Sequence, residues 1–441
     1  MLSRPIRVIL TRSLISNLLP HAQSGFAITK YLAITAAMAT PTQVLKCDPE
    51  SISFSGDKPI YTDPETESAI KSAVLHLTKP HVVAFPTETV YGLGALALDA
   101  SAATKIFSTK GRPSDNPLIV HISSLSMLNS LLPPSYTPSP TYKMLMRAFW
   151  PGPLTLLFPA DPSCVPPIIT AGHSTVAVRM PAHPVARALI ATTGSPLAAP
   201  SANTSGKPSP TRAAHVLRDL GGTGRLPLLL DGGPCAVGLE STVVDGLGED
   251  GALRVLRPGG ATVEALRAVL GDLDVQDGSR RPQVLVHRRD FVLENHEVNA
   301  PTTPGMKYRH YAPGVPVTLL YTSEIDGDGG DGGGSMQRVG LDAFFGEVER
   351  GTSARLGLMA QDDSPLLDRA RCEGSRWVTF SLGGSAEPAR AAQRLFEGLL
   401  SLEEQGVERI FVQEVAEERE GLAFMNRIRK AAGTSLRIVD I

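Results

Sequence analysis

Short apolar runs alternate with stretches of helical periodicity along most of the chain. Between about residues 57 and 270, segments with helix-like spacing of apolar positions lie near 65–78, 101–109, 141–149 and 183–193. The apolar runs between them are HVVAF, PLIVHI, LTLLFPA, STVAVRM, PLAAP, PLLLDGG, STVVDG and LRVLRPG. Runs of this length, rich in β-branched and aliphatic residues, are typical of strands. The alternation predicts a mixed α/β sheet with helices packed on it.

A second and smaller set of elements follows residue 314. Helices are expected near 387–404 and 421–432, and the apolar runs are VTLLY, ARLGLMA, WVTFSL, RIFVQEV and LRIVD. Strands and helices that alternate in this way predict a small parallel sheet covered by helices. Residues 271–313 have weak periodicity and several prolines, which is typical of a connector. The expected domains are therefore 57–270 and 314–441, joined by a linker or lid at 271–313.

The first 47 residues contain no Asp or Glu. Their arginines fall largely off the apolar face of a potential helix, and such an acid-poor amphipathic segment is typical of a mitochondrial targeting sequence. We expect a targeting or disordered segment at 1–47 with a presequence at 1–37. A second start at Met38 would yield a cytoplasmic form, and an untethered terminus without any targeting role is the alternative. The basic residues include Arg4, Arg7, Arg12 and Lys30.

Composition excludes several classes of protein. With 441 residues, 42% hydrophobic and 20% charged, the chain is long enough for two or three domains, and its net charge of −2 gives no general attraction to nucleic acid. The four cysteines form no CxxC pair, so neither a zinc site nor a disulfide framework is indicated. The Gly/Asp tract at 326–335 is typical of a flexible surface insertion. Its acidic oxygens suggest calcium as the alternative, but it lacks the ligand spacing and closing Glu of an EF-hand loop. No segment has the apolar length of a membrane span.

Two cations lie close together in the segment KGRP. Lys110 and Arg112 are two residues apart, with Gly111 between them and Pro113 behind. In an extended loop this spacing points both side chains the same way, and glycine lets the backbone approach a ligand. A guanidinium fork and a compact ammonium together suit a phosphate or a carboxylate. The alternative is a solvated basic turn without a ligand.

Other segments rich in hydroxyl groups and glycine accompany the KGRP loop. In chain order the set reads PTETVYGLG, KGRPSDNPLIVH, STVAVRMP, PSANTSGKPSPT, ESTVVD and RPG. It resembles the YrdC-like threonylcarbamoyl-AMP synthases over about residues 57–270, and residues 314–441 resemble the extra domain of the two-domain members. The resemblance implies a YrdC-like twisted mixed sheet with helices and a smaller C-terminal Rossmann-like α/β domain.

Two shorter matches point elsewhere and are set aside. GLGALA at 92–97 satisfies a loose dinucleotide-binding pattern, but no suitable second strand closes a βαβ unit around it. Ser205-Gly206-Lys207 lacks the earlier glycine of a phosphate loop, and Pro208 stands where Ser or Thr would hold magnesium. Any ATP would therefore bind without a Walker motif.

The resemblance also implies a reaction. In this family L-threonine, bicarbonate and ATP become threonylcarbamoyl-adenylate and pyrophosphate, and the product supplies N6-threonylcarbamoyladenosine in tRNA. The implied catalytic residues are Lys110 and Arg112, which would neutralise phosphate and carbamate oxygens, and Ser201 and Asn203, which would orient them. Ser201 and Asn203 could instead only shape a turn.

Further ligand contacts are implied where the local motif matches. Arg179 suits a bidentate contact with the carboxylate of the amino acid. The residues implied to bind threonine are Thr89, His121, Arg179 and Ser241. Those implied to bind ATP are Arg112, Asn116, Thr175, Ser201, Ser209, Arg257, Tyr308, His310 and Tyr311. A packed edge histidine is the alternative for His121, and helix or turn caps are the alternatives for Thr175 and Ser209.

The remaining expectations concern cofactor, partners and rivals. Mg2+ should accompany ATP, held mostly by phosphates and water, and Glu88 and Glu240 are the nearest acidic residues. The connector segment 304–313 is expected to fold over the nucleotide as a lid. Partners would be the three small substrates and the tRNA threonylcarbamoyl-transfer machinery, with weak or no direct tRNA binding and no membrane. Rival functions are a carbamoyl-adenylate-forming carbamoyltransferase and an RNA-binding module without synthase activity.

Overall fold

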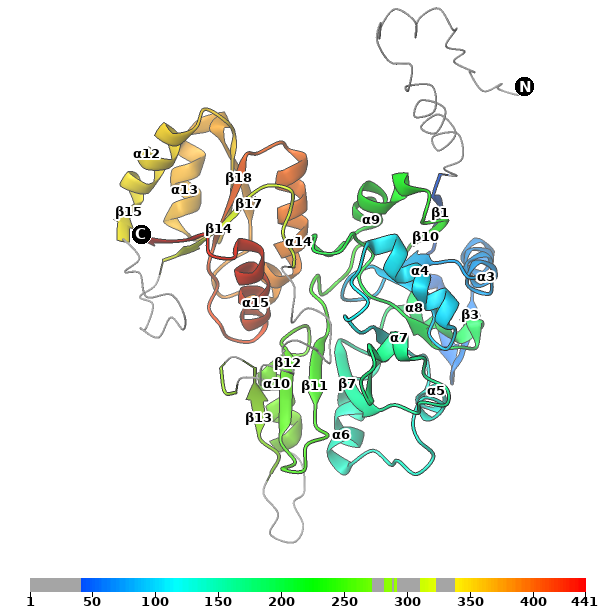
Figure 1. The fold of residues 1–441 in the computed structure, drawn as a ribbon. Helices are drawn as coiled ribbons and strands as arrows, with labels where there is room; N and C mark the ends of the chain where they lie inside the picture. The colour runs from blue at the N-terminus through cyan, green and yellow to red at the C-terminus, as the bar shows by residue number, and fades with distance from the viewer. Residues whose placement is uncertain (1–40, 272–280, 288, 292–309, 323–337) are drawn as a thin grey trace, which may run out of the picture. The chain divides into compact units, whose positions relative to one another are not determined.

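The structure is a computed structural model that describes residues 41–271, 281–287, 289–291, 310–322 and 338–441 (Figure 1). All the elements described below belong to one compact unit, Thr42–Ile441. The expected presequence, Met38, Tyr308 and the tract 326–335 lie outside the described residues. No helix in the described ranges is both long and apolar enough to cross a bilayer.

The larger sheet is mixed. Its strands are β1 (Gln43–Lys46), β4 (Val83–Phe85), β5 (Gly92–Leu96), β6 (Ile119–His121), β7 (Leu154–Pro159), β8 (Thr175–Arg179), β9 (Leu197–Ala198), β10 (Leu228–Asp231), β11 (Thr242–Asp245), β12 (Leu253–Arg257) and β13 (Val284–Val286). They are ordered β1-β10-β4-β5-β9-β6-β8-β7-β11-β12-β13. A separate antiparallel pair is formed by β2 (Ile52–Ser55) and β3 (Lys58–Tyr61).

Helices of this region begin at residues that suit a helix start. Asp63 caps the first of them by accepting hydrogen bonds from the backbone N–H groups of Glu65 and Thr66, and Pro64 occupies the first turn, where a missing N–H costs nothing. Asp99 and Ser139 cap later helices in the same way. The helices are α3 (Pro64–Leu77), α4 (Ala100–Lys110), α5 (Leu125–Asn129), α6 (Pro140–Phe149), α7 (Pro167–Thr170), α8 (Pro184–Thr193), α9 (Ala213–Leu220) and α10 (Val263–Gly271).

Both faces of the larger sheet are buried, which is why its strands read as continuous apolar runs. On β4, Val83 and Phe85 join a core cluster with residues of α3 and α8, whereas Ala84 between them joins the main cluster on the other face. The side chains alternate because successive residues of a strand point to opposite faces. The main cluster includes apolar residues of α4, α6, α9 and α10.

The C-terminal sheet is parallel throughout its described pairs. Its strands are β14 (Val317–Tyr321), β15 (Arg338–Gly340), β16 (Leu356–Ala360), β17 (Trp377–Ser381), β18 (Arg409–Gln413) and β19 (Leu436–Asp440). Their order is β15-β19-β14-β18-β16-β17. The helices are α12 (Leu341–Gly351), α13 (Pro365–Cys372), α14 (Pro388–Glu404) and α15 (Glu420–Ala432).

Helices cover both faces of this second sheet as well. Ile410 and Val412 of β18 pack in a cluster with α14 and α15, and Phe411 packs in a second cluster with Phe344 of α12 and with residues of α13. Figure 1 shows α12 and α13 on one side of these strands and α14 and α15 on the other. The arrangement is the layered α/β fold that alternating strands and helices favour.

The predicted fold class is therefore confirmed: a large mixed sheet with helices is followed by a smaller parallel α/β sheet. The connector predicted at 271–313 nevertheless contributes a strand, since β13 pairs in parallel with β12. Its three residues are too short a run to stand out among the charges around them. The domain boundaries themselves stay a prediction.

Candidate functional site

Polar side chains converge at one edge of the larger sheet because of its topology. β6 and β8 run parallel. β7 is antiparallel to β8, and β11 is parallel to β7. Because β12 is antiparallel to β11, it runs in the same direction as β6 and β8. The last residues of these three strands are His121, Arg179 and Arg257, and Ser241 directly precedes β11. All four line one cavity.

Lys110 and Arg112 enter the same cavity from the end of α4. The sequence suggested an extended loop for these two residues, and the structure does not have one there. Lys110 is the last helical residue, and Gly111 ends the helix in the left-handed region at φ 62°, which glycine adopts at little cost. Both cations are buried, with exposed fractions of 2% and 9%, so the alternative of a solvated turn is wrong.

Backbone carbonyl groups surround these two cations. Lys110 Nζ donates to the carbonyl oxygen of Ser201 and, at 2.5 Å, to that of Asn203. Arg112 donates from Nε to the Asn116 oxygen at 3.1 Å and from Nη2 to the Pro117 oxygen at 2.8 Å. Carbonyl groups satisfy the donors but do not neutralise the charges. The cavity wall therefore keeps its positive charge.

Burial and mutual repulsion shift these groups. Burial, and then the charge of Arg112, lowers the pKa of Lys110 well below its usual value. Burial, and then Arg257, lowers the pKa of Arg112 to about 10. Like charges raise each other's free energy when they share a buried site. A bound anion would relieve that repulsion, so the arrangement favours phosphate or carboxylate ligands.

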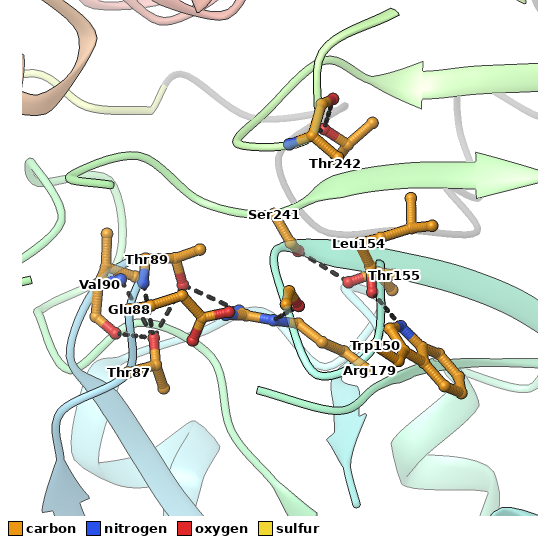
Figure 2. A network of polar contacts seen from close by, with 12 residues as sticks. Thr87, Glu88, Thr89, Val90, Trp150, Leu154, Thr155, Arg179, Ser241 and Thr242 are labelled. Atoms are coloured by element: carbon orange, nitrogen blue, oxygen red, sulfur yellow. Dashed lines mark hydrogen bonds and ion pairs between the residues drawn. The ribbon is translucent and has the colours of Figure 1, made fainter. Parts of the chain in front are cut away.

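Arg179 lies in a polar network with the segment that follows β4 (Figure 2). Its Nη1 donates to Thr89 Oγ1 at 2.8 Å, its Nη2 lies 2.6 Å from Glu88 Oε1, and its Nε donates to the Gly152 oxygen at 3.1 Å. All three nitrogens are thus engaged by the protein. These contacts use only part of the five N–H donors of the guanidinium, and a bidentate contact with the threonine carboxylate stays a prediction.

Ser241 is fixed from two sides. Its Oγ lies 2.7 Å from Thr155 Oγ1. A dashed line marks this contact in Figure 2. Arg257 Nη2 donates to the Ser241 carbonyl oxygen at 2.8 Å. Arg257 also reaches Ser241 Oγ at 3.2 Å. These contacts hold the Ser241 hydroxyl at the cavity, where the resemblance expects threonine.

Ser201 and Asn203 lie in the wall opposite α4. Their backbone carbonyls receive Lys110, and the Asn203 amide donates to the carbonyl oxygens of Thr204 at 2.8 Å and Lys207 at 3.0 Å. The Asn203 side chain thus shapes the loop, in agreement with the alternative that it shapes a turn. Asn203 also lines the cavity. Whether it orients a substrate as well stays a prediction.

His310 and Tyr311, the described end of the expected lid, also line the cavity. Burial, and then Arg112, lowers the pKa of His310 to about 4. Tyr311 is buried, has a φ of 67°, and its ring lies 5.3 Å from that of Phe396 on α14. Tyr308 and the rest of the segment before 310 lie outside the described residues.

Two of the implied ATP contacts are not brought to the cavity. Thr175 begins β8 four residues before Arg179, roughly 13 Å away along a strand. Asn116 is buried under Arg112 and contacts it through its backbone oxygen. Neither side chain is among those that line the cavity, and their contact with ATP stays a prediction.

Other lining residues were not predicted from the sequence. Thr87, Ser205 and Lys207 lie inside the motifs PTETVYG and PSANTSGKPS, so their place in a loop at the site was the available signal. Glu240 was weighed only as a magnesium neighbour. It accepts a hydrogen bond from Ser209 Oγ at 2.5 Å and pairs with Arg427, a residue of the C-terminal sheet region that no motif indicated.

Two carboxylates lie at the site, Glu240 in the cavity wall and Glu88 between the lining residues Thr87 and Thr89, and both face arginines. Glu88 pairs with Arg179 and Glu240 with Arg427. Among the described residues no group of three His, Cys, Asp or Glu side chains could hold a metal ion. Both carboxylates at the site are thus held by arginines, and a role for Mg2+ stays a prediction.

Comparison with known proteins shows which family has this sequence and fold. The family model described as "Telomere recombination" matches residues 76–259, and the one described as "Threonylcarbamoyl-AMP synthase, C-terminal domain" matches 261–433. The chain is 42% identical to the threonylcarbamoyl-AMP synthase of Bacillus subtilis, over 82% of this chain and 93% of the relative. It is 40% identical to that of Schizosaccharomyces pombe, over 83% and 89% of the two chains.

A solved structure is similar over almost the whole chain. Pyrococcus abyssi Sua5 complexed with L-threonine superposes with a TM-score of 0.68 at 33% identity, covering 90% of this chain and all of the other. Since the match includes both sheets, the similarity is not limited to one domain.

His121 should make the fold sensitive to acid. It is buried, its Nδ1 lies 3.1 Å from the Ile119 oxygen, and burial, then Arg179, lowers its pKa to about 3. As the pH falls below about 6.5, the unfolded chain binds a proton that the folded chain excludes, so stability is lost. Between pH 7.5 and pH 5 we expect His121 to account for about 2 kcal/mol of that loss.

Urea unfolding at both pH values measures this contribution. His121→Gln should show a smaller loss between pH 7.5 and 5 than the unchanged chain, and a matched His173→Gln variant, at a partly exposed histidine, should keep the original loss. Equal losses in the His121 variant and the unchanged chain would contradict the prediction.

Proposed function

The chain belongs to the threonylcarbamoyl-AMP synthase family, and on that premise we propose that it converts L-threonine, bicarbonate and ATP into L-threonylcarbamoyl-adenylate and pyrophosphate. The observation that carries the proposal is electrostatic. Lys110 and Arg112 enter one buried cavity, where backbone carbonyls accept their hydrogen bonds, and Glu240 in the cavity wall is paired with Arg427. Such a site suits a ligand with several negative charges.

The reaction has that requirement. The amino group of threonine and bicarbonate combine to a carbamate with loss of water, and a carbamate oxygen then attacks the α-phosphorus of ATP. The bond between that phosphorus and the bridging oxygen breaks, and pyrophosphate leaves. Nucleophile and electrophile are both anionic, so catalysis consists largely of neutralising charge and fixing the reacting atoms.

The residues divide between these tasks in the proposal. Lys110 and Arg112 neutralise the carbamate and α-phosphate oxygens, and Ser241 and Thr89 hold the amino acid near Arg179. Ser209, Arg257 and the His310–Tyr311 segment contact the nucleotide. Ser201 and Asn203 carry the backbone oxygens that fix Lys110, so they act at least through its position.

Mg2+ is proposed to enter with ATP rather than through a protein site. Phosphate oxygens and water satisfy its preference for six oxygen ligands, and this ion shields phosphate charge. The described carboxylates are not required for it, since Glu88 and Glu240 are held by arginines.

The product is proposed to supply the threonylcarbamoyl group of N6-threonylcarbamoyladenosine in tRNA. Transfer would be made by separate machinery, because the net charge of −2 gives this chain no general attraction to RNA.

We expect pyrophosphate release that requires threonine, bicarbonate and ATP together, because the carbamate must form before it can attack ATP. A coupled pyrophosphate assay with each substrate omitted in turn measures this. Release of inorganic phosphate in place of pyrophosphate, or turnover without threonine, would contradict the synthase assignment.

Replacing Lys110 or Arg112 by Met should abolish most of that activity while the protein stays folded, since Met preserves buried volume. By analogy with removed oxyanion donors, each change should cost about 2–4 kcal/mol of transition-state stabilisation. The matched control is Lys105→Met, an exposed lysine of the same helix, which should keep the original rate. Near-normal rates in both site variants would remove these cations from the reaction.

The chain is also proposed to occur in mitochondria and in the cytoplasm, through the acid-free segment at 1–37 and a second start at Met38. A fluorescent tag at the C-terminus should place the full chain at least partly in mitochondria. A version that begins at Met38 should stay cytosolic. The same distribution for both would count against a presequence.

A further inference from the structure

Arg427 on α15 is a charged side chain buried completely in the second sheet region. Its exposed fraction is 0%, and among fully buried side chains of the described chain it is the largest. Moving a guanidinium out of water is costly unless its donors find acceptors and its charge finds a partner. A guanidinium buried at this cost is expected to have specific partners that stabilise its charge.

The partners of Arg427 lie in the other domain, at the candidate site. Its Nε donates to Glu240 Oε2 at 3.1 Å, and its Nη1 donates to the carbonyl oxygen of Pro258, just after β12. Its Cζ lies 5.8 Å from the centre of the Tyr311 ring, within reach of a cation–π contact. Within its own helix Arg427 contacts Asn426 Oδ1 at 3.4 Å.

Glu240 links Arg427 to the cavity wall. Its other oxygen, Oε1, accepts a hydrogen bond from Ser209 Oγ at 2.5 Å, and its backbone oxygen receives the Gly260 N–H at 3.1 Å. Glu240 and Ser209 both line the cavity. Because Glu240 is held at both oxygens, its side chain has one orientation, and the Ser209 hydroxyl is fixed by it.

The charge of Arg427 also matters for the state of Glu240. Burial would raise the pKa of Glu240, but Arg427, then Arg257 and the Ser209 hydrogen bond, outweigh it and lower the pKa below the ordinary value. The carboxylate is thus ionised at neutral pH and only accepts hydrogen bonds. Ser209 then donates to Glu240, and its oxygen lone pairs are left for other donors.

The two domains fit closely beside this contact. A Cβ at Gly238 would lie 2.3 Å from the Gln393 oxygen of α14, so only glycine fits there, at φ 74°. Leu239 and Val90 belong to the same apolar cluster as Leu395 and Phe396 of α14. Arg427 therefore reaches Glu240 from a surface that is packed against the site.

We propose that Arg427 is a positioning residue of the catalytic site, which holds the Glu240 carboxylate, and through it the Ser209 hydroxyl, in the cavity wall. The inference rests on the proposed function for its effect on turnover. It makes the C-terminal domain part of the active site, although Arg427 itself is not among the residues that line the cavity. The affected part is the one where ATP is proposed to bind.

The test is a double-mutant cycle in the full chain with Arg427→Gln, Glu240→Gln and both together. Steady-state pyrophosphate release should give kcat/KM for ATP about 10–100-fold lower in each single variant, and the double variant should be no worse than the weaker single one, because the two residues act as a unit. KM for ATP should rise more than KM for threonine. Arg427→Lys should recover only part of the loss, since lysine lacks the fork that reaches Glu240 and Pro258 together.

Arg429→Gln is the matched control, an arginine of the same helix that is partly exposed and pairs with Glu417. It should stay within about twofold of the unchanged chain, as surface ion pairs contribute little. If Arg427→Gln does not fold, Glu240→Gln alone decides, because it removes the carboxylate from the other side. An Arg427→Gln or Glu240→Gln variant with near-normal kcat/KM, or losses that multiply in the double variant, would overturn the proposal.

A second measurement separates this inference from the proposed function. Hydrogen exchange of the ligand-free protein should become faster at residues 205–211 in Arg427→Gln and remain unchanged in Arg429→Gln. If the unchanged chain released no pyrophosphate, the function would be refuted, and the exchange would still test the positioning. Unchanged exchange at 205–211 in Arg427→Gln would refute the positioning even if the enzyme is active.

Discussion

The site depends on how the protein buries positive charge without cancelling it. Lys110 and Arg112 are satisfied by carbonyl oxygens of Ser201, Asn203, Asn116 and Pro117, which accept hydrogen bonds but carry no net charge. Carboxylates in these places would form ion pairs and leave little attraction for a ligand. The carbonyl shell instead keeps the cations ordered and the cavity positive. A bound polyanion then neutralises the positive charges of Lys110 and Arg112.

The fold makes this shell available through its connections. The end of α4 brings the two cations, and the chain between β9 and α9 brings the carbonyls of Ser201 and Asn203 across from them. The strands β6, β8 and β12 share one direction, so their last residues meet at one edge of the sheet. Apart from α4 and β6, which are consecutive elements, these segments are well separated in sequence. The polar site therefore forms only when the apolar strands have paired in their native order.

This explains how much could be read from the sequence. Runs such as LTLLFPA and RIFVQEV and the helices near 387–404 and 421–432 were located correctly, because burial on both faces or on one helical stripe leaves a local pattern. β1 and β13 were missed, since each has at most four residues and takes its place from its partner strand. The helical position of Lys110 was missed because Gly111 looked like part of a loop rather than the end of α4.

Arg427 could not be found from sequence at all, and the reason is physical. In the segment GLAFMNRIRKAA it resembles Arg429 two residues later, and helical periodicity only assigns it to the buried face. What distinguishes it is a carboxylate in another domain, 187 residues away along the chain. Either charge alone would be too costly to bury. Together, with Ser209 and the Pro258 carbonyl as further partners, they form a buried ion pair with additional hydrogen bonds. Domain docking and the geometry of the cavity wall are therefore coupled, because the pair that stabilises one also orients the other.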